Sequence, residues 1–400
     1  MKSRWSGGLI FLWACFWGGW LHALPFPTEF LAEPGFWDTE DFKEKFEGPA
    51  THIPIVWKSW PGEPVIWEVP PHHVSARFVG GRIDTITVLF LDSGTHFGYL
   101  SRDQAEAVRL VNQDKFRALF LDELQKVRSG LEKFSGQKGE SFTLGKSRML
   151  RQEAWLFVCG NSFARLQVAD EQLIKVSFHR DAESARDWRD ATVRSMVARE
   201  RGSWRRGKVR KLENGDHVIE DVPLLLQGDR AYCGVSTLAM VLQTLGVNMD
   251  TEELAAGAGI HYGSTQGSKI REIMDDAGLE GALKITRATK FDSQKVRSSV
   301  DAGIPVLVWR RFSEERNYLH TQFARRYRED STLSLPSPDS QDRSTWPGKE
   351  SFTHASVITG YNPERREIIF MESWGEFARG RRMRLEEMDA TCYYQFTPQW

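Results

Sequence analysis

The sequence predicts two α+β domains, one on each side of a basic stretch near its middle. Its 400 residues exceed the usual size of one domain. Alternating apolar patterns typical of strands occur in both halves, together with helical patterns. A hydrophobic content of 40% and a charged content of 27% describe a globular chain with sizeable cores. We expect a first domain over residues 24–198, a linker over 199–216 and a second domain over 217–400.

The N-terminus predicts export. Residues 1–4 are basic, residues 9–21 are apolar, and Ala23 is the small residue that a signal peptidase requires. The apolar run is too short and too soon followed by proline to favour a membrane span. We therefore expect a signal peptide over 1–23 and a secreted or periplasmic protein. A lipoprotein anchored through Cys15 is the alternative. The formal net charge of −1 gives no reason to expect nucleic acid or an anionic membrane as the main partner.

The first domain is predicted to combine short strands with one long helix. Gly80-Gly81 is typical of a hairpin turn, and Ser101 with Gln104 resembles a capping box. The expected strands cover residues 55–57, 65–67, 74–78, 83–91, 142–148, 153–159, 163–168 and 173–178, with helices from 101 to about 129 and over 183–199. We find no catalytic constellation here. His72-His73 lack partners at a metal-ligand spacing and are expected in a surface loop.

Three cysteines would remain after signal cleavage, and an odd number leaves at least one thiol free. Cys159 and Cys392 both lie in strand-like patterns, which favours core thiols and leaves a bridge between them open. Residues 199–211 are basic, contain two glycines and lack helical periodicity. They are predicted to form an exposed linker. The linker could also be a processing site that releases the second domain from an inhibitory first one.

Cys233 begins the most informative stretch of the second domain. Apolar residues at three- and four-residue steps after it predict an amphipathic helix of about three turns, and Gly246 is suited to its C-terminal cap. A thiol at a helix N-terminus faces unpaired N–H groups and the positive end of the macrodipole. Such sites commonly lower a cysteine pKa. Cys233 is therefore the candidate nucleophile, and a buried structural thiol is the alternative.

This region resembles papain-like cysteine peptidases, especially the bacterial branch of double-glycine-leader (bacteriocin-processing) peptidases. The resemblance covers about residues 217–398 and depends on motifs in a fixed order. These are Val222-Pro223, Gln227, Cys233-Gly234, residues 238–242, His354-Ala355, Gly360-Tyr361 and residues 372–375. It implies a papain-like domain in which the nucleophile helix packs on a mostly antiparallel sheet.

The chemistry follows the same resemblance. Cys233 would attack as the thiolate, and His354 would hold the proton and return it to the leaving amine. The side-chain amide of Gln227 and the backbone N–H of Cys233 would bind the oxyanion. Papain-like enzymes carry asparagine in the third position and the leader-peptidase branch usually carries aspartate, whereas this chain has Glu372. Ser373 is the alternative third member.

The spacing of His354 and Glu372 supports their pairing independently. Residues 354–361 and 367–373 are two apolar strand patterns joined by a turn sequence at Pro363. Both residues lie nine positions from this proline, so a hairpin would place them opposite each other, about 5 Å apart at Cβ. His261 and His320 are weaker candidates for the base, because neither lies in a strand pattern.

The remaining elements of the second domain are also predicted. Asp250 and Glu253 form a capping box that begins a second helix. A third helix is expected over 268–277, and strands over 217–226, 282–286 and 304–309. The polar insertion over 312–352 is predicted to be a long loop that borders the cleft as a lid or specificity loop.

The predicted function is an exported cysteine peptidase that hydrolyses peptide bonds through a Cys–His thioester intermediate. No metal or organic cofactor is expected, and the partner is a peptide or protein substrate. The first domain could inhibit the site within the chain. Two alternatives remain open: a catalytically silent papain-like binding or scaffold protein, and an amidase or acyltransferase with the same site.

Overall fold

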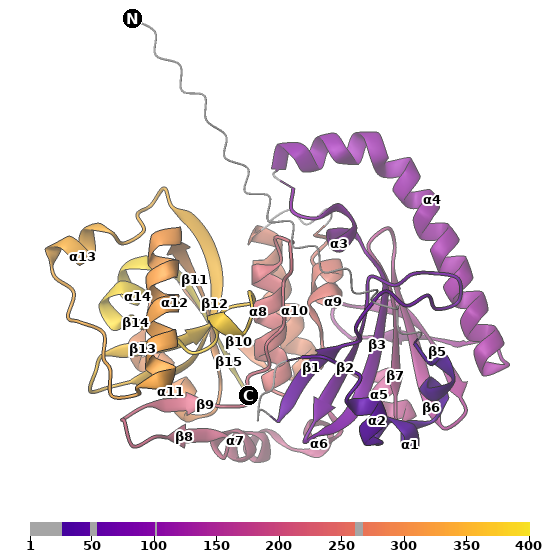
Figure 1. Ribbon diagram of the computed structural model, residues 1–400, viewed down its shortest axis with the longest axis horizontal. Coiled ribbons are helices and arrows are strands. Elements are labelled where there is room, and N and C mark those ends of the chain that lie inside the picture. Colours follow the sequence, from indigo (N-terminus) through magenta and orange to yellow (C-terminus); the bar gives the residue numbers. More distant parts are fainter. Residues whose placement is uncertain (1–25, 49–53, 101, 261–266) are drawn as a thin grey trace, which may run out of the picture.

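The computed structural model describes residues 26–48, 54–100, 102–260 and 267–400. The predicted signal peptide over 1–23 therefore lies outside the described residues. Among the helices of the described part, none is long and apolar enough to cross a membrane. The two α+β regions expected from the sequence are both present, and each contains its own antiparallel sheet (Figure 1).

The first sheet contains seven antiparallel strands in the order β1-β2-β3-β7-β6-β5-β4. The hairpin between β2 and β3 turns at Gly80-Gly81, both with positive φ, as predicted. The expected strand over 65–67 is wrong: only an Ile66–Val69 bridge forms there. The strands are β1 (Ile55–Ser59), β2 (His73–Val79), β3 (Arg82–Asp92), β4 (Glu140–Leu144), β5 (Gln152–Cys159), β6 (Ser162–Ala169) and β7 (Leu173–His179).

One face of this sheet is covered by the long helix α4 (Arg102–Ser135), which continues one and a half turns beyond the predicted end. Phe116, Phe120, Val127 and Leu131 of α4 are buried in the first core. Ser101, the predicted cap, lies outside the described residues. The short elements of this domain are η1 (Thr28–Ala32), α1 (Pro34–Trp37), α2 (Glu40–Lys43) and α3 (Ser93–Phe97).

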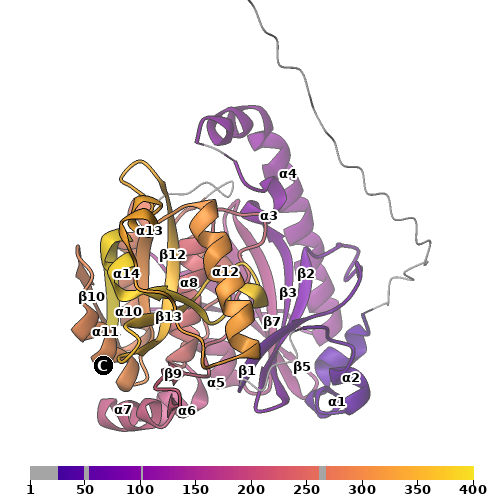
Figure 2. The ribbon, with the colours of Figure 1, turned by 60° about the vertical axis from the view of Figure 1, so that its left-hand side comes forward.

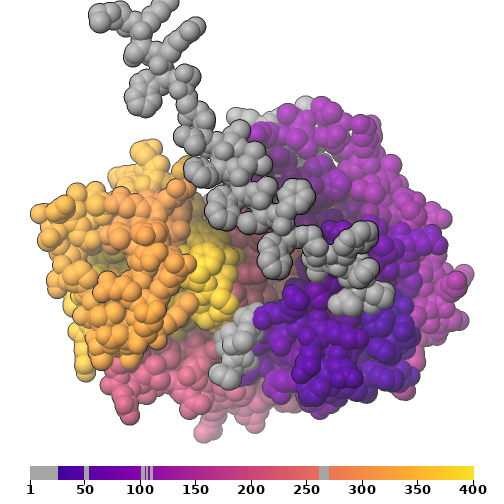
Figure 3. Space-filling view, viewed as in Figure 1, coloured from indigo at the N-terminus to yellow at the C-terminus, as the bar shows by residue number. Residues whose placement is uncertain are grey.

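The connection between the domains differs from the prediction. The expected helix over 183–199 is broken into α5 (Ala182–Arg186) and α6 (Ala191–Ser195). Trp188 interrupts it because its indole is buried and donates to Glu253 of the second domain. The stretch 199–211, predicted to be an exposed linker, forms most of α7 (Ala198–Arg206) and β8 (Val209–Lys211) along the lower edge of the molecule (Figure 3). Arg205 is fully buried and makes a bidentate ion pair with Asp221 at 2.7 and 2.8 Å.

The second sheet is antiparallel, with the order β10-β15-β11-β12-β13-β14, and β9 pairs with β12 and β8. The strand predicted over 217–226 is short, because the chain leaves the sheet after Ile219 to form an irregular segment. The strands are β9 (His217–Ile219), β10 (Lys284–Ala288), β11 (Val306–Phe312), β12 (Phe352–Asn362), β13 (Glu367–Met371), β14 (Arg381–Arg384) and β15 (Cys392–Gln399).

The central helix α8 (Cys233–Thr244) lies between the two sheets, beside α9 (Thr251–Gly257) and α10 (Gly267–Gly281) (Figures 1 and 2). It is not amphipathic as predicted, because every residue after Cys233 is buried. Gly246 has a positive φ just beyond the helix end. The predicted capping box of Asp250 and Glu253 is present at α9. The other helices are α11 (Ser293–Asp301), α14 (Leu385–Thr391) and η2 (Glu376–Ala378).

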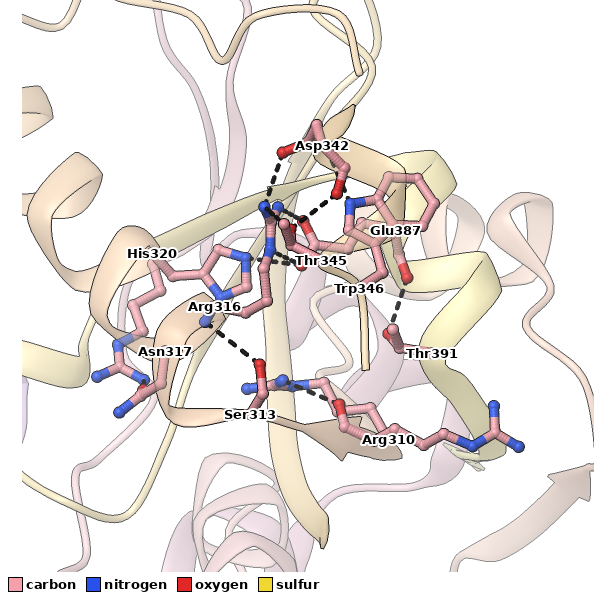
Figure 4. A network of polar contacts seen from close by, with 12 residues as sticks. Arg310, Ser313, Arg316, Asn317, His320, Asp342, Thr345, Trp346, Glu387 and Thr391 are labelled. Atoms are coloured by element: carbon pink, nitrogen blue, oxygen red, sulfur yellow. Dashed lines mark hydrogen bonds and ion pairs between the residues drawn. The ribbon is translucent and has the colours of Figure 1, made fainter. Parts of the chain in front are cut away.

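The polar insertion over 312–352 is largely helical, so the prediction of a long loop is wrong. It contains α12 (Glu314–Glu329) and α13 (Ser340–Ser344). Arg316 links both to α14, since it pairs with Glu387 at 2.5 Å and with Asp342 at 2.7 Å (Figure 4). His320, one of the two weaker candidates for the base, has its Nε2 3.0 Å from the Glu387 carboxylate. This network anchors the insertion on the second domain.

The two domains meet through buried charges. Lys175 on β7 pairs with Asp250 and lies 3.1 Å from Glu253, both at the start of α9. Gln167 on β6 donates to Glu253 at 2.6 Å. All four side chains are buried or nearly so. The face of the first sheet that α4 does not cover therefore packs against the second domain.

Candidate active site

Cys233 is the first residue of α8, directly after the buried Tyr232. The backbone N–H groups of Gly234 and Ala355, and that of Cys233 itself, hydrogen-bond to its sulfur. The contact with Ala355 places the thiol beside β12, one residue from His354. Burial raises the pKa of the Cys233 thiol, and these hydrogen bonds offset only part of that rise. The lowered pKa expected for a helix N-terminus is therefore wrong for this arrangement.

His354 and Glu372 are in contact, with His354 Nε2 3.8 Å from Glu372 Oε1. The pairing is not the direct opposition predicted from Pro363. The turn pairs Asn362 with Glu367, so it is not centred on Pro363, and a β-bulge between Ile358 and Gly360 then moves the register by one residue, so that Val357 pairs with Met371. Continued by one residue, this register puts Ser356 opposite Glu372, and Ser356 Oγ donates to that carboxylate at 2.9 Å. The histidine therefore meets the glutamate diagonally.

Trp374 covers the other side of the histidine. Its ring stacks on the imidazole of His354, with centroids 4.2 Å apart and an interplanar angle of 27°. Phe312 at the end of β11 contacts the edge of both rings. His354 is 7% exposed, so the aromatic cover leaves little of its ring in contact with water.

Gln227 lies on the irregular segment before α8 and is tied to Ser373. Its backbone N–H donates to the Ser373 carbonyl at 2.9 Å, and its Oε1 accepts from Ser373 Oγ at 2.7 Å. Its Nε2 donates to the Arg230 carbonyl at 3.0 Å. A carboxamide nitrogen carries two hydrogens, so one remains for a substrate oxygen. Gln227, Cys233, His354 and Glu372 thus converge from three segments of the second domain.

Glu372 has stronger partners than His354. Arg310 on β11 and Arg381 on β14 each donate to one of its oxygens, and all three side chains are at most 2% exposed. Burial raises the pKa of this carboxyl, but Arg310, the adjacent His354, Arg381 and Ser356 together hold it at about 2. Neither arginine is predicted from the sequence, because Arg310 lies far from Glu372 along the chain and Arg381 lies outside any recognisable motif.

Comparison with known proteins finds one family that resembles the second domain. Residues 219–399 match the model of the Peptidase_C39 like family. The second domain is therefore similar to this family of peptidase-like proteins. A solved structure from Bacillus anthracis named as a C39-like peptidase is 17% identical, covering 45% of this chain and 96% of that one with a TM-score of 0.29. No curated protein matches the chain.

The first domain holds the loop that connects Gln227 to Cys233 in the C39-like domain. Arg230 in this loop lies 3.2 Å from Asp92 of β3 and 2.6 Å from Glu252. Tyr232 also donates to Asp92, at 3.2 Å. Asp92 is 2% exposed and caps α3 through the backbone N–H of Thr95. The nucleophile of the C39-like domain therefore follows a loop that is clamped by a carboxylate from outside that domain.

The other candidates from the sequence lie elsewhere. His261 is outside the described residues. His320 is a buried residue of α12 that packs on Phe370 and lies 3.0 Å from Glu387, in the network of Figure 4. Cys159 and Cys392 are free and buried, which excludes a bridge between them. His72 accepts a hydrogen bond from the backbone of Asp92. Within the described residues, no group of histidine, cysteine or carboxylate side chains could hold a metal ion.

Proposed function

We propose that the chain is a thiol-dependent peptidase in which Cys233 is the nucleophile and His354 is the base. The observation that carries the proposal is the position of the Cys233 sulfur at the start of α8. It accepts from the N–H of Ala355, next to a histidine that is shielded by Trp374 and contacts a carboxylate. The similarity of residues 219–399 to a peptidase-like family supports the same chemistry.

The steps follow from the positions of these groups. The Cys233 sulfur forms a bond to the substrate carbonyl carbon while its proton passes to His354. The backbone N–H of Cys233 and the second hydrogen of Gln227 Nε2 stabilise the oxyanion. The C–N bond then breaks, and the amine leaves with the proton from His354. Water, deprotonated by the same imidazole, hydrolyses the thioester and regenerates the thiol.

In this proposal, the Cys233 thiol and the His354 imidazole are both uncharged before substrate binds. A carboxylate 3.8 Å from an imidazolium would stabilise it by about 4 kcal/mol at an effective dielectric constant near 20. Here Arg310 and Arg381 offset that attraction, and burial lowers the pKa of His354 to about 4. The thiol and imidazole therefore remain uncharged near pH 7, and the proton moves only when substrate binds.

A silent binding module is the second candidate, and the charge balance of Glu372 is the observation that favours it. A glutamate held by two arginines has little capacity left to stabilise an imidazolium. If Glu372 serves mainly to pair with the two arginines, the Cys–His pair contributes to the fold and not to catalysis. The acyltransferase or amidase alternative uses the same steps, with an amine or a non-protein amide as the substrate.

Thiol labelling separates the peptidase from the silent module. We expect iodoacetamide to label Cys233 in the native chain, while Cys159 and Cys392 serve as internal controls, because burial raises the pKa of both to about 12. His354→Ala should slow labelling of Cys233 by at least tenfold, and the matched variant His96→Ala on α3 should leave it unchanged. Equal rates in all three proteins would refute His354 as the base.

Peptide turnover tests the reaction itself. Incubation with a mixed pool of unstructured peptides, followed by mass spectrometry, should give cleavage products that disappear in Cys233→Ala. Cleavage that persists in this variant would refute Cys233 as the nucleophile. Products formed only with an added amine would instead support the acyltransferase.

Export is a separate proposal, which rests on residues 1–23 of the sequence. N-terminal sequencing of the protein recovered from the producing cells should begin at Leu24. A chain that retains Met1 would refute cleavage after Ala23, and a lipid-modified chain beginning at Cys15 would support the lipoprotein alternative.

A further inference from the structure

A cavity of about 600 Å³ lies between the first sheet and the loop that precedes Cys233. From the first domain it is lined by Trp57, Leu89 and Lys175 among others. From the second domain it is lined by the run Leu224–Leu226 and by Arg230. The cavity therefore exists only because the two domains are packed together.

The cavity adjoins the proposed active site. Leu226 and Gly228 line it and flank Gln227 in the sequence. Gly375 also lines it and follows Trp374, whose ring stacks on His354. The hydrogen bond from Gln227 N–H to the Ser373 carbonyl holds these two segments side by side. A ligand in the cavity would therefore lie on the side of the active site that contains His354.

The lining combines apolar walls with an excess of carboxylates. Trp57, Leu89 and the three leucines give the apolar part. Four carboxylates line the cavity (Asp229, Asp250, Glu252 and Glu376), against the cations Lys175 and Arg230. Both cations are already neutralised, Lys175 by Asp250 and Arg230 by Glu252.

Glu376 pairs with Arg379 at 3.1 Å, which leaves Asp229 as the carboxylate of the lining without a cationic partner. Asp229 is exposed, and its side chain makes no hydrogen bond or ion pair with the described residues. A positive group on a ligand would thus meet an uncommitted carboxylate, whereas a negative group would meet only cations that are already paired. The net field of the lining favours a cationic ligand.

We propose that this cavity binds the part of a peptide substrate on the amine side of the cleaved bond, and that it selects an apolar side chain followed by lysine or arginine. The assignment rests on the proposed function for its place in the reaction. The leaving amine takes its proton from His354, and the cavity opens beyond the tryptophan that covers this histidine. The apolar side chain would contact Leu226, and the cation would pair with Asp229.

Binding can be measured without turnover. Full-length Cys233→Ala is titrated by calorimetry with three probes, each acetylated and amidated: Gly-Leu-Lys-Gly, Gly-Leu-Glu-Gly and Gly-Gly-Lys-Gly. We expect the first probe to bind at least tenfold more tightly than either of the others. In the same background, Leu226→Gln and Asp229→Asn should each weaken its binding at least fivefold. Both residues are exposed, so neither substitution should unfold the chain.

Matched controls come from exposed residues away from the cavity. Leu121→Gln on α4 changes a leucine of similar exposure, 54% against 56% for Leu226. Asp170→Asn changes an exposed carboxylate after β6. Neither should affect binding. Equal affinity for the lysine and glutamate probes, or unchanged binding in Leu226→Gln and Asp229→Asn, would overturn the proposal. If the first probe binds selectively but the unsubstituted protein cleaves no peptide, the cavity assignment stands and the peptidase proposal is refuted.

Discussion

Replacement of Glu372 by glutamine should destabilise the protein far more than loss of an ordinary catalytic side chain. The carboxylate is completely buried and receives one arginine on each oxygen. Glutamine preserves the shape but leaves Arg310 and Arg381 as uncompensated buried cations. Removal of one member of a buried ion pair typically costs about 3–5 kcal/mol. For a domain of this size, that corresponds to a fall in melting temperature of roughly 6–20 °C.

A double-mutant cycle with Arg381→Gln isolates the ion pair. Glu372→Gln leaves two buried cations and Arg381→Gln leaves Glu372 paired with Arg310 alone, whereas the double variant leaves one cation fewer than Glu372→Gln. Its free energy of unfolding, measured by denaturant titration, should therefore exceed the additive expectation by about 1–3 kcal/mol. Glu220→Gln serves as the control, because Glu220 pairs with Arg210 on the surface and should cost at most about 1 kcal/mol.

The cycle has a clear refuting result. If Glu372→Gln costs less than about 1 kcal/mol, or if the two substitutions are additive, the arginines do not depend on this carboxylate. Glu372 would then be free to orient His354, and the neutral resting site would be wrong. A large cost with strong coupling would instead show that the glutamate serves the fold as well as the histidine.

Three further predictions test other parts of the reasoning. Gly94→Ala should destabilise the chain by about 1–3 kcal/mol and slow labelling of Cys233, because a Cβ there would collide with the ring of Tyr232, whereas Gly35→Ala meets no atom within 4 Å and should be neutral in both assays. The free energy of unfolding should fall as the pH drops from 6.5 towards 4, since the neutral buried His354 takes up a proton on unfolding. In denaturant titrations His354→Gln should make this fall shallower without removing it, because burial also lowers the pKa of His72 to about 4. A nick introduced at an engineered protease site between residues 207 and 208 should leave the halves associated on size-exclusion chromatography; their separation would refute the buried interface.

Local patterns were sufficient for most regular elements. The strands β2, β3, β5, β6 and β7 fall within one residue of their predicted positions, because short runs rich in β-branched and aromatic residues between turn residues identify strands from local sequence alone. By contrast, β4 begins two residues before and ends four residues before the predicted strand. The capping box at Asp250 was also predictable, because both hydrogen bonds form within four residues. The cysteine and the histidine of the site were found through motif order and the turn at Pro363.

The failures share a different cause, namely partners that are remote in the sequence. Trp188 breaks a helical pattern because its partner Glu253 lies 65 residues away. Residues 199–211 were predicted to be a solvated linker because their arginines are charged. Arg205 is nevertheless buried, since it forms an ion pair with the buried Asp221. The contact between His354 and Glu372 was predicted with the wrong register, because the hairpin turns between Asn362 and Glu367 and not symmetrically about Pro363. The bulge after Ile358 corrects this difference by only one residue.

The same reasoning bears on what the first domain does. A removable inhibitory segment would be expected to meet its partner through a surface that tolerates water once it leaves. Here Asp92 contacts both Arg230 and Tyr232, and Lys175 contacts Asp250, all with little or no exposure. Separation would therefore expose paired charges and also release the loop that precedes Cys233. The buried carboxylate of Asp92 argues for a first domain that positions the nucleophile loop and completes the adjoining cavity, rather than one that must be discarded before the site can work.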